Sequence, residues 1–142
     1  MQPYNMNWTK EEMALIEKAR NAAKNAYCPY SRFPVGAAVE TDIGIVEGCN
    51  VENASYGLSC CAERIALFAA AARGASVYTR LAVSCIKGDE IGSPTGLMPC
   101  GACRQVIAEL MPRAAYVLVD KAGRFCAADL LPYPFQLVKE PK

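Results

Sequence analysis

The sequence predicts an α/β domain in which helices flank a mixed β-sheet. With 142 residues, the chain is long enough for one core that buries roughly two-thirds of the surface of its unfolded form. Its 53% hydrophobic and 20% charged residues are typical of a globular protein. Its segments follow the order helix, strand, strand, helix, strand, helix, strand, with a last short segment that also fits a strand. Because neither a repeat nor a linker interrupts this order, we expect a single layered domain over residues 1–142.

The first predicted elements are a helix and a hairpin. Thr9 can cap the helix, with Glu12 at the capping-box position, and the helix is expected to continue to the break at Pro29. Its expected helical stripe consists of Ala14, Leu15, Lys18, Ala19, Ala22 and Ala26. The stretches "VGAAVET" and "IVEGCNVE", separated by "DIG", are typical of two strands joined by a glycine-containing turn.

The rest of the chain alternates between helices and apolar strands. Residues 60–72 are alanine-rich and predict a helix that Gly74 ends, and "LAVSCI" (81–86) is typical of a buried strand. Residues 87–98 predict a surface loop because they are polar and rich in Gly and Pro. The stretch "PCGACRQVIAELM" predicts a helix that begins at Pro99. "AAYVLVD" predicts a buried strand, followed by a "KAG" turn and a short segment at "RFCAA".

Charge and composition exclude several classes of function. The formal net charge is only +1, so the basic surface expected of a nucleic-acid-binding protein is absent and no nucleic-acid partner is expected. The polar start of the chain and the lack of a long apolar stretch predict no membrane association and a cytoplasmic protein. Eight cysteines without a signal peptide indicate reduced thiols, some of them bound to metal. Because the chain has no histidine, a soft-metal site must use cysteine.

Three cysteines and one glutamate have the spacing of a metal site. Cys100 and Cys103 share one face if they lie in the first turn of a helix, where thiolates are favoured. A structural zinc site would need a second such pair, whereas this chain offers Cys61 at another predicted helix start. Three thiolates leave the fourth tetrahedral position open to water, as in catalytic zinc sites. Glu63 lies two residues from Cys61, where a general base for that water is expected.

At these residues the chain resembles the cytidine deaminase family in its small, homotetrameric form. The matching stretches are "FPVGAA", "GCNVENASYG", "CAER", "PCGACRQVI" and "LLPYPF". The resemblance implies a three-layer α/β/α fold with a mixed sheet of about five strands. It implies one Zn²⁺ per chain on Cys61, Cys100 and Cys103, with Glu63 moving protons. The implied reaction, in pyrimidine salvage, converts free cytidine and 2′-deoxycytidine to uridine and 2′-deoxyuridine with release of ammonia.

The resemblance also implies roles for residues around this centre. The implied substrate contacts are Phe33 against the base, Asn50 and Glu52 on the sugar 3′-hydroxyl, Ala62 at the base edge, and Phe135 in a neighbouring subunit's site. Arg64 and Arg104 are implied to donate hydrogen bonds to the ligand sulfurs. Simpler interpretations remain open: surface arginines, polar residues at a turn, and aromatic residues of the core. Cys60, Cys28, Cys49, Cys85 and Cys126 are expected to have no metal role, and the last four to be buried.

Three alternative functions remain. The loop Lys87–Met98 is longer than the resemblance leads us to expect, which would suit a deaminase of another aminopyrimidine nucleoside, such as the antibiotic blasticidin S. The intact "NVENA" argues against it. A non-catalytic zinc-binding module predicts a closed four-cysteine site and a basic surface. A dithiol redox protein would use Cys100 and Cys103 but leaves Cys61 and Glu63 without a role.

Overall fold

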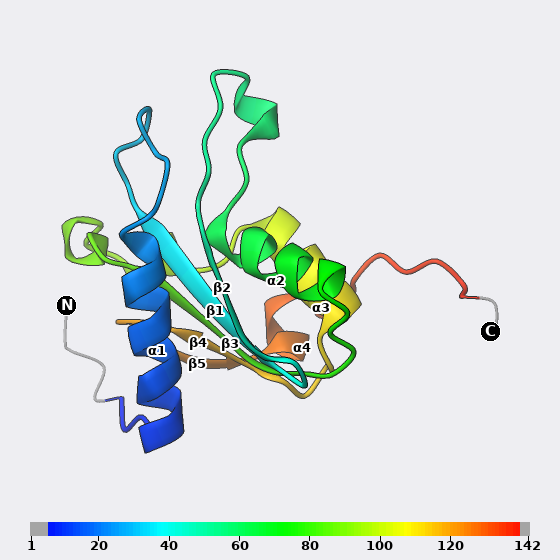
Figure 1. Ribbon diagram of the computed structural model, residues 1–142. Coiled ribbons are helices and arrows are strands. Elements are labelled where there is room, and N and C mark those ends of the chain that lie inside the picture. Colours follow the sequence, from blue (N-terminus) through cyan, green and yellow to red (C-terminus); the bar gives the residue numbers. More distant parts are fainter. Residues whose placement is uncertain (1–5, 140–142) are drawn as a thin grey trace.

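A computed structural model describes residues 6–139, and its centre is a mixed five-stranded sheet (Figure 1). The strand order is β2-β1-β3-β4-β5; β3 and β4 run parallel, and every other neighbouring pair is antiparallel. The strands are β1 Val35–Thr41, β2 Gly44–Cys49, β3 Tyr78–Cys85, β4 Tyr116–Val119 and β5 Gly123–Cys126. The prediction of a mixed sheet of about five strands is confirmed.

Helices cover both faces of the sheet and complete three layers. One layer is α1 alone, and the opposite face carries the other three helices (Figure 1). The helices are α1 Lys10–Ala23, α2 Ala62–Ala72, α3 Gly101–Leu110 and α4 Ala127–Leu130. Three short 3₁₀ turns lie in the loops, namely η1 Tyr56–Leu58, η2 Gly88–Glu90 and η3 Pro94–Leu97. Among residues 6–139, no helix is both long and apolar enough to cross a membrane.

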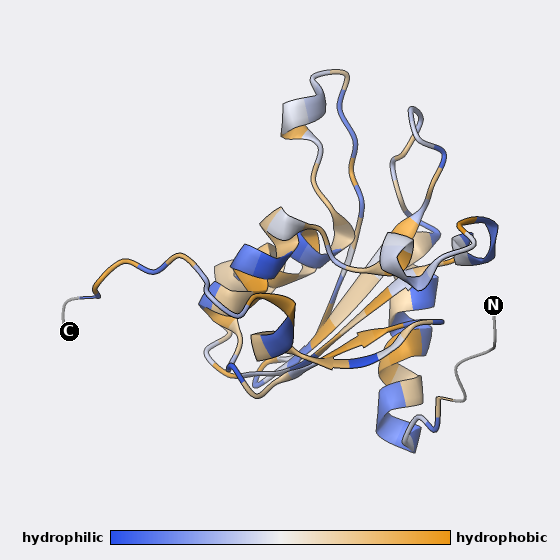
Figure 2. Ribbon diagram, turned by 180° about the vertical axis from the view of Figure 1, so that it is seen from behind, coloured by the Kyte–Doolittle hydropathy of each residue, from blue (hydrophilic) through white to orange (hydrophobic). Residues whose placement is uncertain are grey.

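Alternate residues of the central strands build two separate cores. In β1, Ala37 and Val39 pack in the larger core with α2 and α3, whereas Ala38 packs with α1. This is the period of two that a strand imposes on its side chains. Figure 2 shows hydrophobic residues gathered on the strands between the helix layers, with hydrophilic residues on the helices. The sheet is therefore buried on both faces, and the functional groups must lie at its edges or at helix ends.

A glycine in β2 fixes how closely α2 approaches the sheet. A Cβ atom at Gly48 would lie 2.5 Å from the backbone nitrogen of Ala66 and 2.8 Å from the carbonyl oxygen of Ala62, both in α2. Real Cβ atoms essentially never approach other atoms that closely. The first residue of α2 therefore sits directly on the strand, and this contact sets the position of the helix start, which carries Cys61 and Glu63.

The structure departs from the sequence prediction at several points. The helix α1 has the predicted capping box but ends at Ala23, and Ala14 and Lys18 of the expected stripe are exposed. The helix α3 begins at Gly101 with Cys100 as its N-cap, so the prediction that Pro99 begins it is wrong. The segment "RFCAA" forms the end of β5 and then the short helix α4. Of the four cysteines expected to be buried, only Cys85 is; the others, Cys28, Cys49 and Cys126, are half-buried.

Candidate metal centre and substrate pocket

Two helix starts bring three cysteine sulfurs together. Cys61 is the N-cap of α2, Cys100 is the N-cap of α3, and Cys103 lies in the first turn of α3. The two helices pack side by side on the same face of the sheet (Figure 1). All three Sγ atoms lie within 4.8 Å of one another, and Cys61 Sγ is 3.8 Å from Cys100 Sγ. The unpaired N–H groups and positive dipole ends of two helices thus face one cluster, which favours thiolates there.

The geometry of this cluster fits a zinc ion. Zinc–sulfur bonds of about 2.3 Å place the sulfurs of a tetrahedral site about 3.8 Å apart, which is the separation of Cys61 and Cys100. Three soft thiolates are a donor set that zinc prefers. Cys60 does not belong to this cluster. Among the described residues the cluster therefore offers three ligands rather than the four of a closed structural site.

Glu63 lies in the first turn of α2 and is only 5% exposed. Its side chain lines the same pocket as Cys61 and Cys100. Burial raises the pKa of Glu63 to about 7, because the charged carboxylate loses its solvation. A carboxyl group in this position can take up and release protons beside the metal centre.

The two arginines expected at the sulfurs have different partners. Arg64 donates from Nη2 to Cys61 Sγ at 3.4 Å. Hydrogen bonding with Cys103, followed by that with Arg64, holds the pKa of Cys61 well below its usual range. The guanidinium of Arg104 instead donates to the carbonyl oxygens of Pro99 and Leu130, so the structure does not show its expected contact with sulfur. Leu130 is the last residue of α4, where carbonyl groups lack partners within the helix.

A cavity of about 240 Å³ opens next to the cysteine cluster. Four residues expected to contact substrate line it: Phe33, Asn50, Glu52 and Ala62. Asn50 also fixes the pocket wall, since it accepts from Val35 N at 2.8 Å and donates to Phe33 O at 2.9 Å. Glu52 accepts from the amides of Tyr30 and Ser31 through Oε1. Both side chains thus hold local backbone in addition to facing the cavity.

Phe135 lies apart from this cavity. It is 70% exposed on the chain that follows α4, and its backbone exchanges two hydrogen bonds with the side chain of Gln105. The prediction that Phe135 serves a neighbouring subunit stays a prediction, since a single chain carries no test of it.

Sequence reasoning missed several residues of the pocket wall. These are Ser31, Val35, Cys85, Gly96, Leu97 and Met98. Leu97 and Met98 directly precede Pro99 and Cys100, so their nearness to a cysteine ligand was an available signal. Cys85 offered none, because the end of an apolar strand gives no indication of which cavity it faces.

Comparison with known proteins identifies the family. Residues 9–119 match the family model described as the cytidine and deoxycytidylate deaminase zinc-binding region. The chain belongs to this family. Since the matched region is a zinc-binding one and includes all three clustered cysteines, zinc is the metal of this centre.

Relatives of this deaminase family match over most of the chain. A cytidine deaminase from Halalkalibacterium halodurans is 47% identical over 130 residues, covering 88% of this chain and 94% of the relative. One from Mycobacterium tuberculosis is 46% identical over 126 residues, covering 87% and 89%. The crystal structure of cytidine deaminase from Burkholderia pseudomallei has a TM-score of 0.76 and 44% identity, covering 90% of this chain and all of that one. The α/β fold expected of the family is thus confirmed.

Proposed function

We propose that this protein is a zinc-dependent cytidine deaminase, which hydrolyses cytidine and 2′-deoxycytidine to uridine and 2′-deoxyuridine and releases ammonia. One observation carries the proposal: the buried carboxyl group of Glu63 shares a pocket with two sulfurs of an open three-cysteine cluster. Curated relatives at 46–48% identity are cytidine deaminases, which supports the choice of substrate.

The residues of the centre divide the chemistry between them. Cys61, Cys100 and Cys103 would hold the zinc, which supplies Lewis acidity that lowers the pKa of water at its open position. Glu63 takes a proton from the attacking water and delivers it to N3 of the cytosine ring. The same carboxylate then takes the proton of the new C4 hydroxyl group and gives it to the amino nitrogen, so that the C4–N bond breaks, ammonia leaves and the C4 carbonyl of uridine forms. Arg64 withdraws charge from Cys61 through its hydrogen bond and keeps the three-thiolate site from becoming too electron-rich.

The pocket wall supports recognition of a nucleoside. Phe33 offers an aromatic side chain for the base, and Ala62, whose N–H has no partner within α2, offers a donor for the base edge. Because both amide hydrogen bonds to Glu52 go to Oε1, its other oxygen can accept the sugar 3′-hydroxyl together with Asn50. A carboxylate at that place also disfavours a nearby phosphate, which supports a free nucleoside as substrate.

The proposal extends to assembly and location. We expect a homotetramer in which Phe135 completes the site of a neighbouring subunit, acting in pyrimidine salvage in the cytoplasm. Large exposed apolar side chains support an assembly: Tyr56 and Leu58 are 75% and 71% exposed. Light scattering of the purified protein should give four times the mass of the chain, whereas a monomer would contradict this part.

The activity test follows the loss of cytidine absorbance and the release of ammonia. Wild-type protein should convert cytidine stoichiometrically with about one zinc per chain. Glu63→Gln should keep its zinc but lose activity by at least about 10³-fold, near the upper end for an acid–base group. Glu47→Gln, at an exposed position of β2, is the matched control and should behave as wild type. Zinc bound without any turnover of cytidine or 2′-deoxycytidine would contradict the proposed substrate.

A further inference from the structure

Two segments that carry none of the metal ligands form much of the pocket wall. One is residues 28–33, which contributes Ser31 and Phe33, and the other is the loop 87–98, which contributes its last three residues. The side chain of Lys87 joins them, since its Nζ donates to the carbonyl oxygen of Arg32 at 3.2 Å. Lys87 lies outside the pocket wall, so its effect on a ligand must pass through these two segments.

The acceptor of this hydrogen bond is the carbonyl oxygen of Arg32, whose backbone conformation is strained. Arg32 has a φ of 54°, in the left-handed region that non-glycine residues rarely adopt. Such a strained conformation persists only where the surrounding structure holds it. Its neighbours Ser31 and Phe33 both line the pocket, and Glu52 holds the amide of Ser31. A charged donor on the Arg32 carbonyl therefore stabilises the conformation that aims Phe33 at the cavity.

The loop from which Lys87 acts is packed against itself. A Cβ atom at Gly96 would lie 2.3 Å from Ile91 Cγ2, and one at Gly88 would lie 2.8 Å from Leu97 Cδ2. Leu97 is buried and also lines the pocket. The loop is thus compact, so a displacement of its first residues also displaces Leu97 at its other end.

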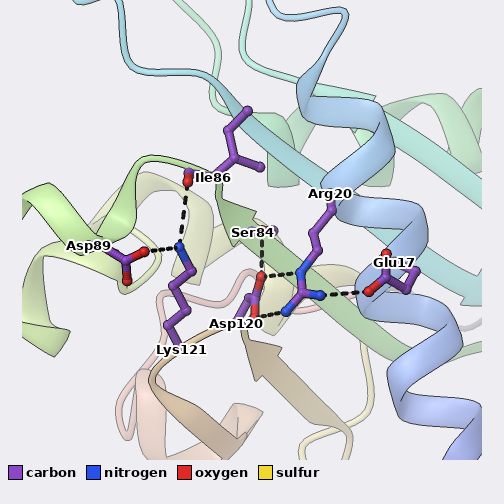
Figure 3. Close-up of polar contacts among 7 residues, drawn as sticks. All are labelled: Glu17, Arg20, Ser84, Ile86, Asp89, Asp120 and Lys121. Atoms are coloured by element: carbon purple, nitrogen blue, oxygen red, sulfur yellow. Dashed lines mark hydrogen bonds and ion pairs between the residues drawn. The ribbon is translucent and has the colours of Figure 1, made fainter. Parts of the chain in front are cut away.

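The start of this loop is in turn anchored to the sheet (Figure 3). Lys121, in the turn between β4 and β5, donates from Nζ to Asp89 Oδ2 at 3.0 Å and to the carbonyl oxygen of Ile86 at 3.5 Å. The preceding residue, Asp120, is buried and accepts bonds from Arg20 in α1 and Ser84 in β3. These hydrogen bonds hold Ile86 and Asp89, on either side of Lys87 in the sequence, against the sheet.

We propose that Lys87 is a positioning residue for the substrate pocket, clasping the loop 87–98 to the segment 28–33 so that Phe33 and Leu97 stay in place. The inference rests on the proposed function for its kinetic consequence. The clasp, by which we mean the Lys87–Arg32 hydrogen bond between the two segments, also predicts how fast their amides exchange, and that measurement requires no turnover.

The test compares Lys87→Met with Lys87→Arg and with a matched control. Lys18→Met removes the same charge from an exposed position on α1, on the other face of the sheet. Hydrogen–deuterium exchange should accelerate in residues 31–33 and 95–98 of Lys87→Met, but not in the control. For cytidine, Lys87→Met should raise KM about 3- to 10-fold, as expected for loss of one ordinary, solvent-exposed hydrogen bond, with kcat within twofold and zinc unchanged. Lys87→Arg should have a KM close to that of the wild-type protein.

The outcomes separate the clasp from the proposed function. Unchanged exchange in both segments overturns the clasp, whatever the activity. Faster exchange with an unchanged KM overturns the positioning role, as does an equal rise in KM in Lys18→Met. If wild-type protein does not deaminate cytidine, the proposed function is wrong, while faster exchange limited to Lys87→Met would still support the clasp.

Discussion

The close contact between Gly48 and α2 makes a sharp prediction about how the fold sets the site. In Gly48→Ala the new Cβ would lie 2.5 Å from Ala66 N, about 0.9 Å inside the 3.4 Å at which ordinary contacts begin. Both nearby atoms are backbone, so no side chain can turn away, and α2 must move from β2 by most of that distance. Catalytic groups need placement within about 0.5 Å, and α2 begins with Cys61 and Glu63.

The expected losses follow from this displacement. Overpacking costs about 1–3 kcal/mol of stability, which lowers the Tm by about 3–10 °C. A shift approaching 1 Å in the catalytic group should lower kcat about 10²-fold. Thermal unfolding, zinc content and cytidine kinetics measure these effects, with Glu47→Gln, at the exposed neighbour of Gly48 in β2, as the control. Gly48→Ala with wild-type kcat and Tm would refute the claim that this contact positions the helix.

Three further predictions concern the helix cap, the buried carboxylate and the metal. Thr9→Ala removes the capping box and should cost about 1 kcal/mol, a fall of about 2–4 °C in Tm, with unchanged kinetics; altered kinetics would contradict a purely structural role. Burial tends to raise the pKa of Asp120, but hydrogen bonds from Arg20 and Ser84 leave it below its ordinary value. The charge therefore stabilises the fold above the unfolded-state pKa and ceases to do so as the pH falls through the folded-state pKa. Urea unfolding should show Asp120→Asn about 2 kcal/mol less stable than wild type at pH 7, with the difference shrinking below about pH 4; a constant difference would argue against the charged pair. Removal of zinc with a chelator should abolish activity and lower the Tm by about 8 °C or more, and added zinc should restore both; full activity in metal-free protein would contradict a catalytic metal.

Local patterns in the sequence predicted the elements that depend on local chemistry. The first strand was predicted with the bounds it has, Val35–Thr41, and the capping box of Thr9 and Glu12 is present. Gly74 ends α2 in a left-handed conformation, with a φ of 92°. The three cysteines also meet as predicted, because two helix starts on one face of a sheet can present their first residues to each other.

Features that depend on distant packing could not be predicted in this way. Arg104 was assigned to a sulfur, but its partners are carbonyl oxygens whose positions depend on where the chain turns before α3 and after α4. Cys85 enters the pocket wall because of how the end of β3 packs, which no sequence periodicity records. The contact between Lys87 and Arg32 also depends on distant packing, since the two residues are 55 positions apart in the sequence.

The measurement that tests the central claim most directly is zinc K-edge X-ray absorption of the purified, zinc-loaded protein. The account predicts one zinc per chain with three sulfur neighbours at about 2.3 Å and one lighter neighbour, the position left open for water. Cys100→Ser should then show the loss of one sulfur. Four sulfur neighbours in wild-type protein would indicate a closed structural site and contradict a catalytic role for the metal.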